Sequence, residues 1–73
     1  MREWLKQLRT FKGLTQKEMA KTIGITDGYY ALIENGQRQK KGMDVTVLAG
    51  IAKATGMSVG RVAVMELTYL GKS

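Results

Sequence analysis

The sequence repeats one arrangement of residues at four sites, and this repetition favours a helical fold. At each site an apolar residue precedes a residue that caps helix N-termini, and a second apolar residue lies four positions after the cap. The four sites are Leu14-Thr15 with Met19, Ile25-Thr26 with Tyr30, Met43-Asp44 with Leu48, and Met57-Ser58 with Val62. Glycines precede three of these sites, at positions where helices commonly end: Gly13, Gly24 and Gly56. The pattern predicts that a helix begins at each cap.

An amphipathic segment before the first cap predicts a further helix. Its apolar residues recur at intervals of one, three or four, which places them on one helix face: Met1, Trp4, Leu5, Leu8 and Phe11. We therefore expect an all-α chain with helices at approximately 2–12, 15–23, 26–35, 44–55 and 58–66. One domain would span residues 1–66, followed by a C-terminal tail over 67–73. Gly50 and Gly60 fall inside predicted helices, and each should weaken its helix by up to about 1 kcal/mol.

The sequence of 73 residues contains neither cysteine nor histidine, which narrows its chemistry. Their absence excludes disulfides and thiol nucleophiles, removes most zinc sites, and removes the commonest general base. The six Asp and Glu are scattered, and there is no glycine-rich phosphate loop. We therefore expect no enzymatic activity, no catalytic residue, no metal site and no cofactor. A chain without cysteines suits a reducing cytoplasm, which is the expected setting. No apolar run approaches the roughly 18 residues of a membrane span, so we expect no membrane association.

Positive charge is concentrated in the N-terminal part of the chain. The net charge is +6; residues 1–43 hold nine Lys and Arg against four Asp and Glu, whereas residues 44–73 hold three against two. A basic region of this kind indicates a polyanionic partner such as nucleic acid. The alternative is a solvated lysine-rich surface with no partner, and charge alone leaves both interpretations open.

Residues 16–35 have the pattern of two short helices joined by a tight turn. Gly24 can adopt the left-handed backbone conformation that turns the chain sharply. Ala20 is small where two helices must approach closely, and Thr26 begins the next helix. Two short helices joined in this way form a helix-turn-helix.

Several runs of residues within and around this unit carry a specific resemblance. They are Gly13-Leu14-Thr15-Gln16-Lys17-Glu18-Met19-Ala20, Gly24-Ile25-Thr26, Tyr29-Tyr30, Ile33-Glu34-Asn35-Gly36, and Ile51-Ala52-Lys53-Ala54-Thr55-Gly56-Met57-Ser58-Val59. Together they resemble the XRE/Cro-type helix-turn-helix family, which includes many phage and bacterial repressors. The resemblance implies a five-helix lambda-repressor-like domain whose third helix docks in the major groove of double-stranded DNA. It also implies a prokaryotic or phage-encoded transcriptional regulator, with repression the favoured role, that often binds as a dimer.

The resemblance also implies roles for individual residues. The positions that would face bases are Thr26, Asp27, Gly28, Ala31 and Leu32. The positions that would contact phosphates are Gln16, Lys17, Tyr29, Asn35, Arg38, Lys40 and Lys41. Arg9 and Glu34 match a structural pair that would hold the first helix to the end of the third. Two unrelated surface charges are the alternative for this pair.

The base-facing set departs from what sequence-reading proteins usually carry. None of its residues is Arg, Lys, Asn or Gln, which are the usual bidentate readers of guanine and adenine. Asp27 can accept a hydrogen bond from cytosine but repels phosphate, while Ala31 and Leu32 can contact only a thymine methyl group. We therefore expect weak direct readout, with specificity from phosphate register, DNA shape or dimer spacing. The loop after Gly36 is also longer than usual for the family and lacks its common proline.

Two further expectations keep alternatives open. A homodimer would form through the last helix and the tail, using Val62, Met65, Leu67 and Leu70, unless these are scattered apolar residues of an ordinary terminal helix. A protein-interaction module, such as an antitoxin-like partner, could use the same fold with weak DNA binding. The unusual base-facing set favours that second interpretation, and the basic N-terminal part of the chain argues against it.

Overall fold

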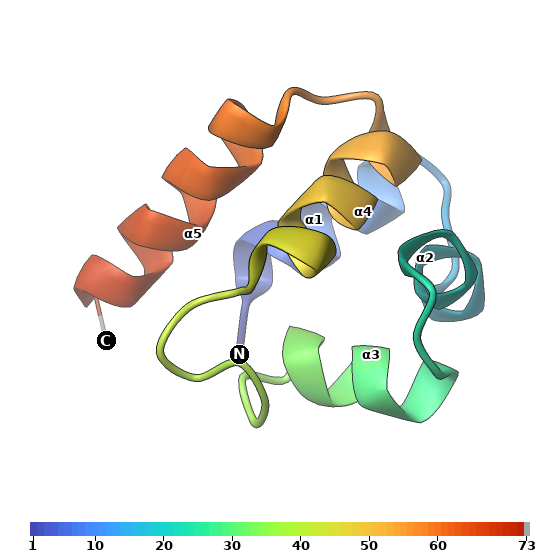
Figure 1. Ribbon diagram of the computed structural model, residues 1–73, viewed down its shortest axis with the longest axis horizontal. Coiled ribbons are helices and arrows are strands. Elements are labelled where there is room, and N and C mark those ends of the chain that lie inside the picture. The colour runs from blue at the N-terminus through green and yellow to red at the C-terminus, as the bar shows by residue number, and fades with distance from the viewer. Residues whose placement is uncertain (73) are drawn as a thin grey trace.

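The computed structural model describes residues 1–72, and these residues form five α-helices (Figure 1). The helices are α1 (Glu3–Phe11), α2 (Gln16–Ile23), α3 (Asp27–Glu34), α4 (Val45–Thr55) and α5 (Val59–Lys72). The described residues contain no strand, so the all-α class predicted from the sequence is confirmed. Within this part of the chain no single helix is long and apolar enough to cross a membrane; α4 and α5 reach that threshold only when taken together across a bend of 118°.

Each of the four capping residues stands at a helix N-terminus, as the sequence predicted. Their side-chain oxygens accept hydrogen bonds of 2.9–3.2 Å from the backbone N–H three residues later, and the residues are Thr15, Thr26, Asp44 and Ser58. The Glu18 carboxylate accepts a hydrogen bond from the Thr15 N–H at 2.8 Å and completes a capping box. Gly24 and Gly56 end α2 and α4 in the left-handed conformation, with φ of 90° and 72°. These local bonds satisfy backbone groups that a helix end would otherwise leave unpaired.

The last helix is longer than the sequence predicted. The expected end at residue 66, with a tail over 67–73, was wrong, because α5 continues to Lys72. Two contacts to distant segments hold the extra turns: the Tyr69 ring lies 5.1 Å from the Arg2 guanidinium carbon, and Leu70 lies against Gly42, where a Cβ would come within 3.4 Å of Leu70 Cδ1. Packing of this kind commonly stabilises helices beyond what local sequence provides. Ser73, the last residue of the expected tail, lies outside the described residues.

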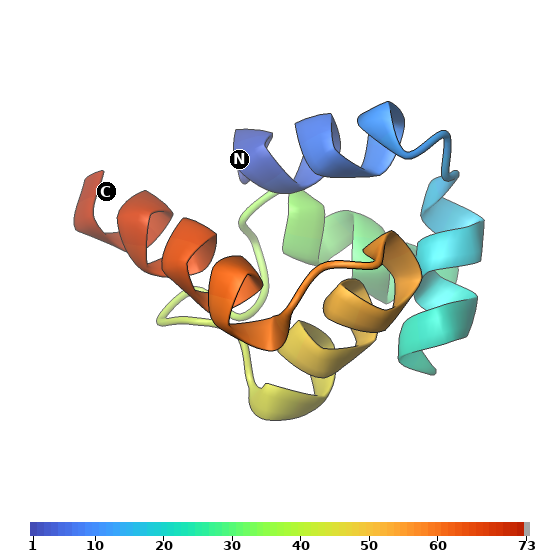
Figure 2. The same cartoon turned by 90° about the horizontal axis from the view of Figure 1, so that it is seen from above.

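All five helices and the loop before α4 contribute to one apolar core, and α3 lies along one edge of the molecule (Figure 1). The buried apolar residues are Leu5, Met19, Ala20, Ile23, Tyr30, Ile33, Met43, Val47, Ile51, Ala52 and Val62, of which Tyr30 and Ile33 belong to α3. Figures 1 and 2 both place α5 on the side of the molecule opposite α2. The fold therefore separates the helix-turn-helix from the outer surface of α5.

Helices α2 and α4 approach each other closely at Gly50. A Cβ at this position would lie 2.7 Å from Ile23 Cγ1 and 2.8 Å from Ile23 Cα, closer than side chains are normally found to pack. Gly50 therefore does more than weaken its helix, because it lets two backbones come together. Gly60, in the first turn of α5, has open space at the same position.

We expect Gly50→Ala to lower the free energy of unfolding. Overpacking of a core commonly lowers the free energy of unfolding by about 1–3 kcal/mol. The better helix propensity of alanine raises it by about 1 kcal/mol at most. The backbone of Ile23 cannot move aside as a flexible side chain would, so the loss should exceed the gain. Gly60→Ala is the matched control and should be neutral or stabilising. Urea unfolding of both variants followed by circular dichroism makes the comparison, and equal stability of the two would contradict the interpretation of Gly50.

Candidate nucleic-acid interface

The outer face of α3 is free of the core, and the base-facing candidates lie on it. Tyr30 and Ile33 point inward and are buried, while Asp27 and Gly28 are exposed. The candidates follow the helical spacing of one side of α3: Thr26 as the exposed N-cap, then Asp27, Gly28, Ala31 and Leu32, the last two half-buried. Asn35 is exposed directly after the helix. The structure thus brings the five base-facing candidates together on one accessible side of a helix.

Glu34, at the C-terminal end of α3, is the centre of a buried hydrogen-bond network. Arg9 binds it through two N–H groups, with Nε at 2.9 Å from Oε2 and Nη2 at 3.1 Å from Oε1. The Tyr30 hydroxyl donates to Oε2 at 2.7 Å, and Gln16 Nε2 lies 3.3 Å from Oε1. The side chains of Arg9 and Glu34 are only 12% and 3% exposed. The structure therefore brings together the two residues of the expected pair, and joins α1, α2 and α3 through it.

The network shifts the ionisation of its members. Burial raises the pKa of Glu34, but the hydrogen bonds from Arg9, Tyr30 and Gln16 and the positive charge of Arg9 outweigh burial, so this pKa lies below its usual range. The hydrogen bond to Glu34 raises the pKa of Arg9. Burial, followed by the hydrogen bond to Glu34, raises the pKa of the Tyr30 hydroxyl. All three pKa shifts favour the same ionisation states: an ionised Glu34 that accepts hydrogen bonds from a charged Arg9 and from a neutral Tyr30.

Gln16, expected at a phosphate, is half-buried, and its amide faces the protein on one side. Its nitrogen donates one hydrogen bond to Glu34. A primary amide carries two N–H groups, so the second can still reach a ligand in front of α2. Lys17, the next residue, is exposed in the first turn of the same helix. The Glu34 network thus orients a residue at the N-terminus of α2, where free backbone N–H groups favour anions.

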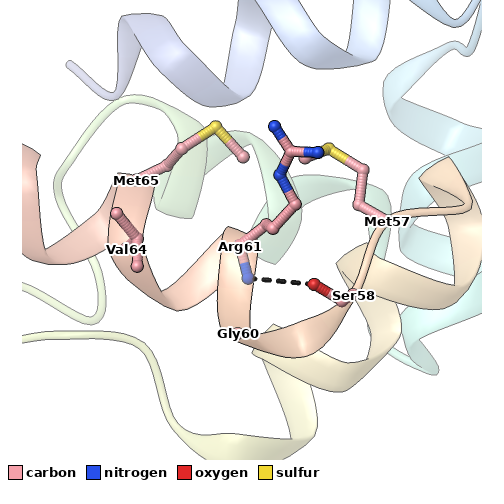
Figure 3. Close-up of a pocket in the computed structure, with 6 residues that line it drawn as sticks. All are labelled: Met57, Ser58, Gly60, Arg61, Val64 and Met65. Carbon is pink, nitrogen blue, oxygen red and sulfur yellow. Dashed lines mark hydrogen bonds between the residues drawn. The ribbon is translucent and has the colours of Figure 1, made fainter.

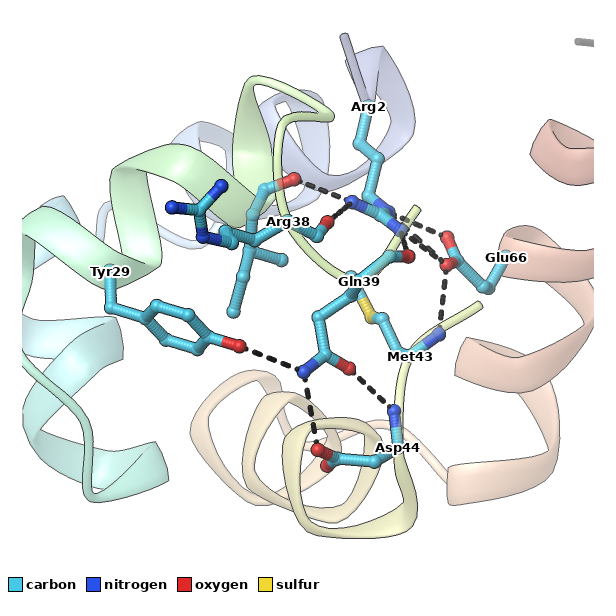
Figure 4. Close-up of polar contacts among 8 residues, drawn as sticks. Arg2, Tyr29, Arg38, Gln39, Met43, Asp44 and Glu66 are labelled. Carbon is cyan, nitrogen blue, oxygen red and sulfur yellow. Dashed lines mark hydrogen bonds and ion pairs between the residues drawn. The ribbon is translucent and has the colours of Figure 1, made fainter. Parts of the chain in front are cut away.

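A second buried ion pair, between Arg2 and Glu66, was missed by the sequence interpretation (Figure 4). Arg2 is fully buried, and its Nε and Nη2 lie 2.9 and 2.8 Å from Glu66 Oε1 and Oε2. Its Nη1 and Nη2 groups also donate to the backbone carbonyls of Ile33, Arg38 and Gln39. Every N–H of the guanidinium therefore has an acceptor, which is the condition under which a buried charge is tolerated.

The sequence did carry one signal for this pair. Glu66 lies four residues after Val62, so it continues the stripe of α5 that faces the core. No local pattern indicates its partner, because Arg2 is 64 residues away. Because Glu66 comes from the C-terminal part of the chain, this pair makes the surface of the N-terminal part less basic than its composition suggests, whereas Arg9 and Glu34 cancel within that part.

The loop between α3 and α4 is held in place by the same arginine and by Gln39. Arg2 binds the Gln39 carbonyl, and the Gln39 amide bonds the Tyr29 hydroxyl at 3.0 Å and both the backbone and the carboxylate of Asp44 (Figure 4). Apart from Lys17, the cations expected at phosphates lie on this loop: Lys40 and Lys41 are exposed, and the Arg38 side chain extends away from the Arg2 cluster. The additional loop length relative to the expected family pattern is therefore folded and fixed against α3.

The dimer candidates on α5 do not all face outward. Val62 is fully buried in the core, so its expected place in an interface was wrong. Leu70 is half-buried, whereas Leu67 is 66% exposed. Val64, outside the predicted set, is 61% exposed, and Met65 beside it lines a surface hollow. The periodicity of α5 explains the difference, because Val62 and Glu66 share the inward side of the helix and Val64 and Leu67 do not.

The helices and the exposed face of α3 define a helix-turn-helix domain, and comparison with known families agrees. The family described as a helix-turn-helix domain matches residues 3–58, so the chain belongs to this family. The match ends at the start of α5.

The chain is also similar to a protein of Bacillus subtilis (strain 168) named as the uncharacterized HTH-type transcriptional regulator YqaF. The two are 54% identical over 39 residues, which cover 53% of this chain and 51% of the relative. The similar region thus spans about half the length of that relative. No solved structure matches the chain.

The lowered pKa of Glu34 predicts a pH-dependent difference between the natural chain and Glu34→Gln. At neutral pH the variant loses a hydrogen-bonded charge, and its free energy of unfolding should fall by about 1–3 kcal/mol. As the pH falls below about 4.5, the unfolded state takes up the Glu34 proton before the folded state does. The natural chain then loses stability that the variant never had, so the gap between them should close.

Urea unfolding at neutral pH and at several acidic values measures this gap. Glu18 also has a lowered pKa, caused by the hydrogen bond from the Thr15 N–H, but it is common to both proteins. Glu3→Gln on the exposed surface of α1 is the control and should change the free energy of unfolding little. A Glu34→Gln gap that stays constant into acid would contradict the assignment of the shift.

Proposed function

We propose that this chain is a DNA-binding transcriptional regulator that docks α3 in the major groove. The observation that carries the proposal is the exposed outer face of α3, flanked by the N-terminus of α2 and by the cationic loop before α4. On a duplex, this arrangement would present one helix to base edges, with donors on both sides of it for phosphates. The name of the Bacillus subtilis relative, a transcriptional regulator, supports the same class of function.

Phosphate contacts would supply most of the affinity. The proposed set is the one expected from the sequence: Gln16, Lys17, Tyr29, Asn35, Arg38, Lys40 and Lys41. Lys17, Lys40 and Lys41 are exposed, so their charges are accessible to a duplex. Contacts of this kind position the protein and depend strongly on salt.

Base readout would be weak and semi-specific. Ala31 and Leu32 offer only apolar contact with thymine methyl groups, and Asp27 offers an acceptor for cytosine. Thr26 already accepts a hydrogen bond from the Tyr29 N–H, although its hydroxyl proton can still be donated. Discrimination would then come largely from DNA shape and from the spacing of two half-sites.

Repression of transcription is the simplest outcome of such binding, because a protein that occupies a DNA site is enough to block transcription there. A prokaryotic cytoplasm would be the setting.

Salt dependence of binding tests this proposal. Fluorescence anisotropy of a labelled random duplex, titrated at several salt concentrations, should give a linear decrease of log K with log salt. Lys40→Ala combined with Lys41→Ala should weaken binding and reduce the slope by about 0.9 for each phosphate that the variant no longer neutralises. Lys53→Ala, an exposed cation near the opposite end of α4 from the loop, is the control and should leave the slope unchanged. Absence of binding at low salt would contradict the proposal and favour a protein-interaction module.

We further propose that two copies pair through α5. The exposed positions Gly60, Val64, Leu67 and Gly71 follow each other at intervals of four, three and four along one side of the helix. This spacing is the same in both directions, so an antiparallel second helix would set Val64 against Leu67 of the other copy. Both glycines have open space where a Cβ would stand, which permits close approach. Figure 3 shows the start of this surface, where Val64 and Met65 border a hollow lined also by Met57, Ser58, Gly60 and Arg61.

A single charged substitution tests the pairing. Val64→Glu should leave the fold intact, because Val64 is 61% exposed, and should shift the protein to monomer in sedimentation velocity. Val45→Glu is the matched control, since Val45 is 76% exposed on α4 and lies off the proposed surface. A natural chain that remains monomeric at high concentration, or a Val64→Glu variant that still dimerises, would rule out α5 as the interface.

A further inference from the structure

A hydrogen bond from the Asp44 backbone N–H determines the orientation of the Gln39 side-chain amide. The backbone N–H of Asp44 lies 2.7 Å from Gln39 Oε1, and a backbone N–H can only donate. The amide oxygen must therefore face Asp44 N, and the amide nitrogen must face the other way. That nitrogen lies 3.2 Å from the Asp44 carboxylate and 3.0 Å from the Tyr29 hydroxyl (Figure 4).

This orientation decides what the Tyr29 hydroxyl can offer to a ligand. The hydroxyl oxygen accepts from Gln39 Nε2, so its own proton must point elsewhere. Among the described residues, no acceptor for that proton is seen. Tyr29 is half-buried on α3, next to the exposed cationic loop, so its hydroxyl is held while its proton remains available.

We propose that Gln39 is a positioning residue for DNA binding: it fixes the Tyr29 hydroxyl as a hydrogen-bond donor to a backbone phosphate. The inference rests on the proposed function and adds a residue that reaches DNA only through another side chain. A phosphate oxygen is an acceptor only, so a hydroxyl that cannot turn inward to donate is matched to it in advance. A tyrosine without the hydrogen bond from Gln39 would have to adopt this hydroxyl orientation when DNA binds.

The backbone of Gln39 supports the same role. Its φ is 57°, and it is the only residue other than glycine with a positive φ in residues 1–72. This left-handed conformation is unfavourable for a residue with a side chain. The Gln39 carbonyl accepts a hydrogen bond from Arg2, which Glu66 of α5 holds in turn. The conformation that aims the amide at Tyr29 is thus maintained by a buried ion pair.

A double-mutant cycle tests the proposal, with Gln39→Met, Tyr29→Phe and both together bound to a labelled duplex. Tyr29→Phe should weaken binding about tenfold or more, because it removes a hydrogen bond to a charged group. Gln39→Met should weaken binding less, and should add little once Tyr29 is already Phe. Because the hydroxyl is neutral, neither variant should change the salt slope, whereas the Lys40 and Lys41 variant should. Additive losses in the cycle, or a changed slope, would overturn the proposal.

Gln39→Gly separates the side chain from the backbone. Glycine adopts a positive φ freely, so the loop should keep its path while the amide is lost. Binding as weak as that of Gln39→Met supports the positioning role, and binding equal to the natural chain overturns it.

A measurement without DNA distinguishes failure of this inference from failure of the proposed function. In the free protein, the side-chain amide signals of Gln39 in a ¹⁵N correlation spectrum should shift in Tyr29→Phe. They should not shift in Tyr69→Phe, the control at another half-buried tyrosine. No shift in Tyr29→Phe overturns the Gln39–Tyr29 contact even where DNA is bound. A natural chain that binds no duplex overturns the DNA-binding function and the phosphate role with it, while the spectrum still reports on the contact.

Discussion

The rest of the structure depends on the complete burial of the Arg2 guanidinium. A buried cation is tolerated only when its charge and all its N–H groups find partners. Glu66 supplies the charge, and three backbone carbonyls from the end of α3 and the following loop supply the remaining acceptors. The Arg2 backbone N–H also donates to the Glu34 carbonyl at 2.8 Å. The N-terminus, the end of α3, the loop and α5 must therefore assemble together, since any one missing would leave part of the charge unsatisfied.

Two ionic networks meet at the C-terminal end of α3 and leave the rest of that helix free. The Glu34 carboxylate ties it to Arg9 of α1 and Gln16 of α2, while its backbone is tied to Arg2. The N-terminal turn and the outer face are held mainly by the Thr26 cap and by the inward packing of Tyr30 and Ile33. The helix is thus anchored at one end and on one side, and its outer face stays open, as the proposed docking in a groove requires.

The distribution of charge follows from the same networks. Two arginines of the basic N-terminal part are neutralised inside the protein, and the cations that remain accessible include Lys17 on α2 and those of the loop before α4. Charge is thus available beside α3 rather than on its outer face, where the side chains are small, apolar or acidic. In the proposed function, the residues that would contact phosphates are therefore separate from those that would contact bases, and the phosphate-contacting set carries the charge.

The sequence by itself determined the elements that depend on neighbouring residues. Capping bonds and glycine turns act within a few positions, so Thr15, Thr26, Asp44 and Ser58 could be identified as helix starts, and the helix-turn-helix with them. The Arg9 and Glu34 contact followed from a family pattern and not from spacing. Only the tertiary structure decided the pairing of Arg2 with Glu66 and the hydrogen bond from Gln39 to Tyr29. It also decided the close approach at Gly50 and the true end of α5. Each of these features either joins segments that are far apart in the chain or depends on a contact that does. Neither periodicity nor local preference indicates which distant groups will meet when the core forms.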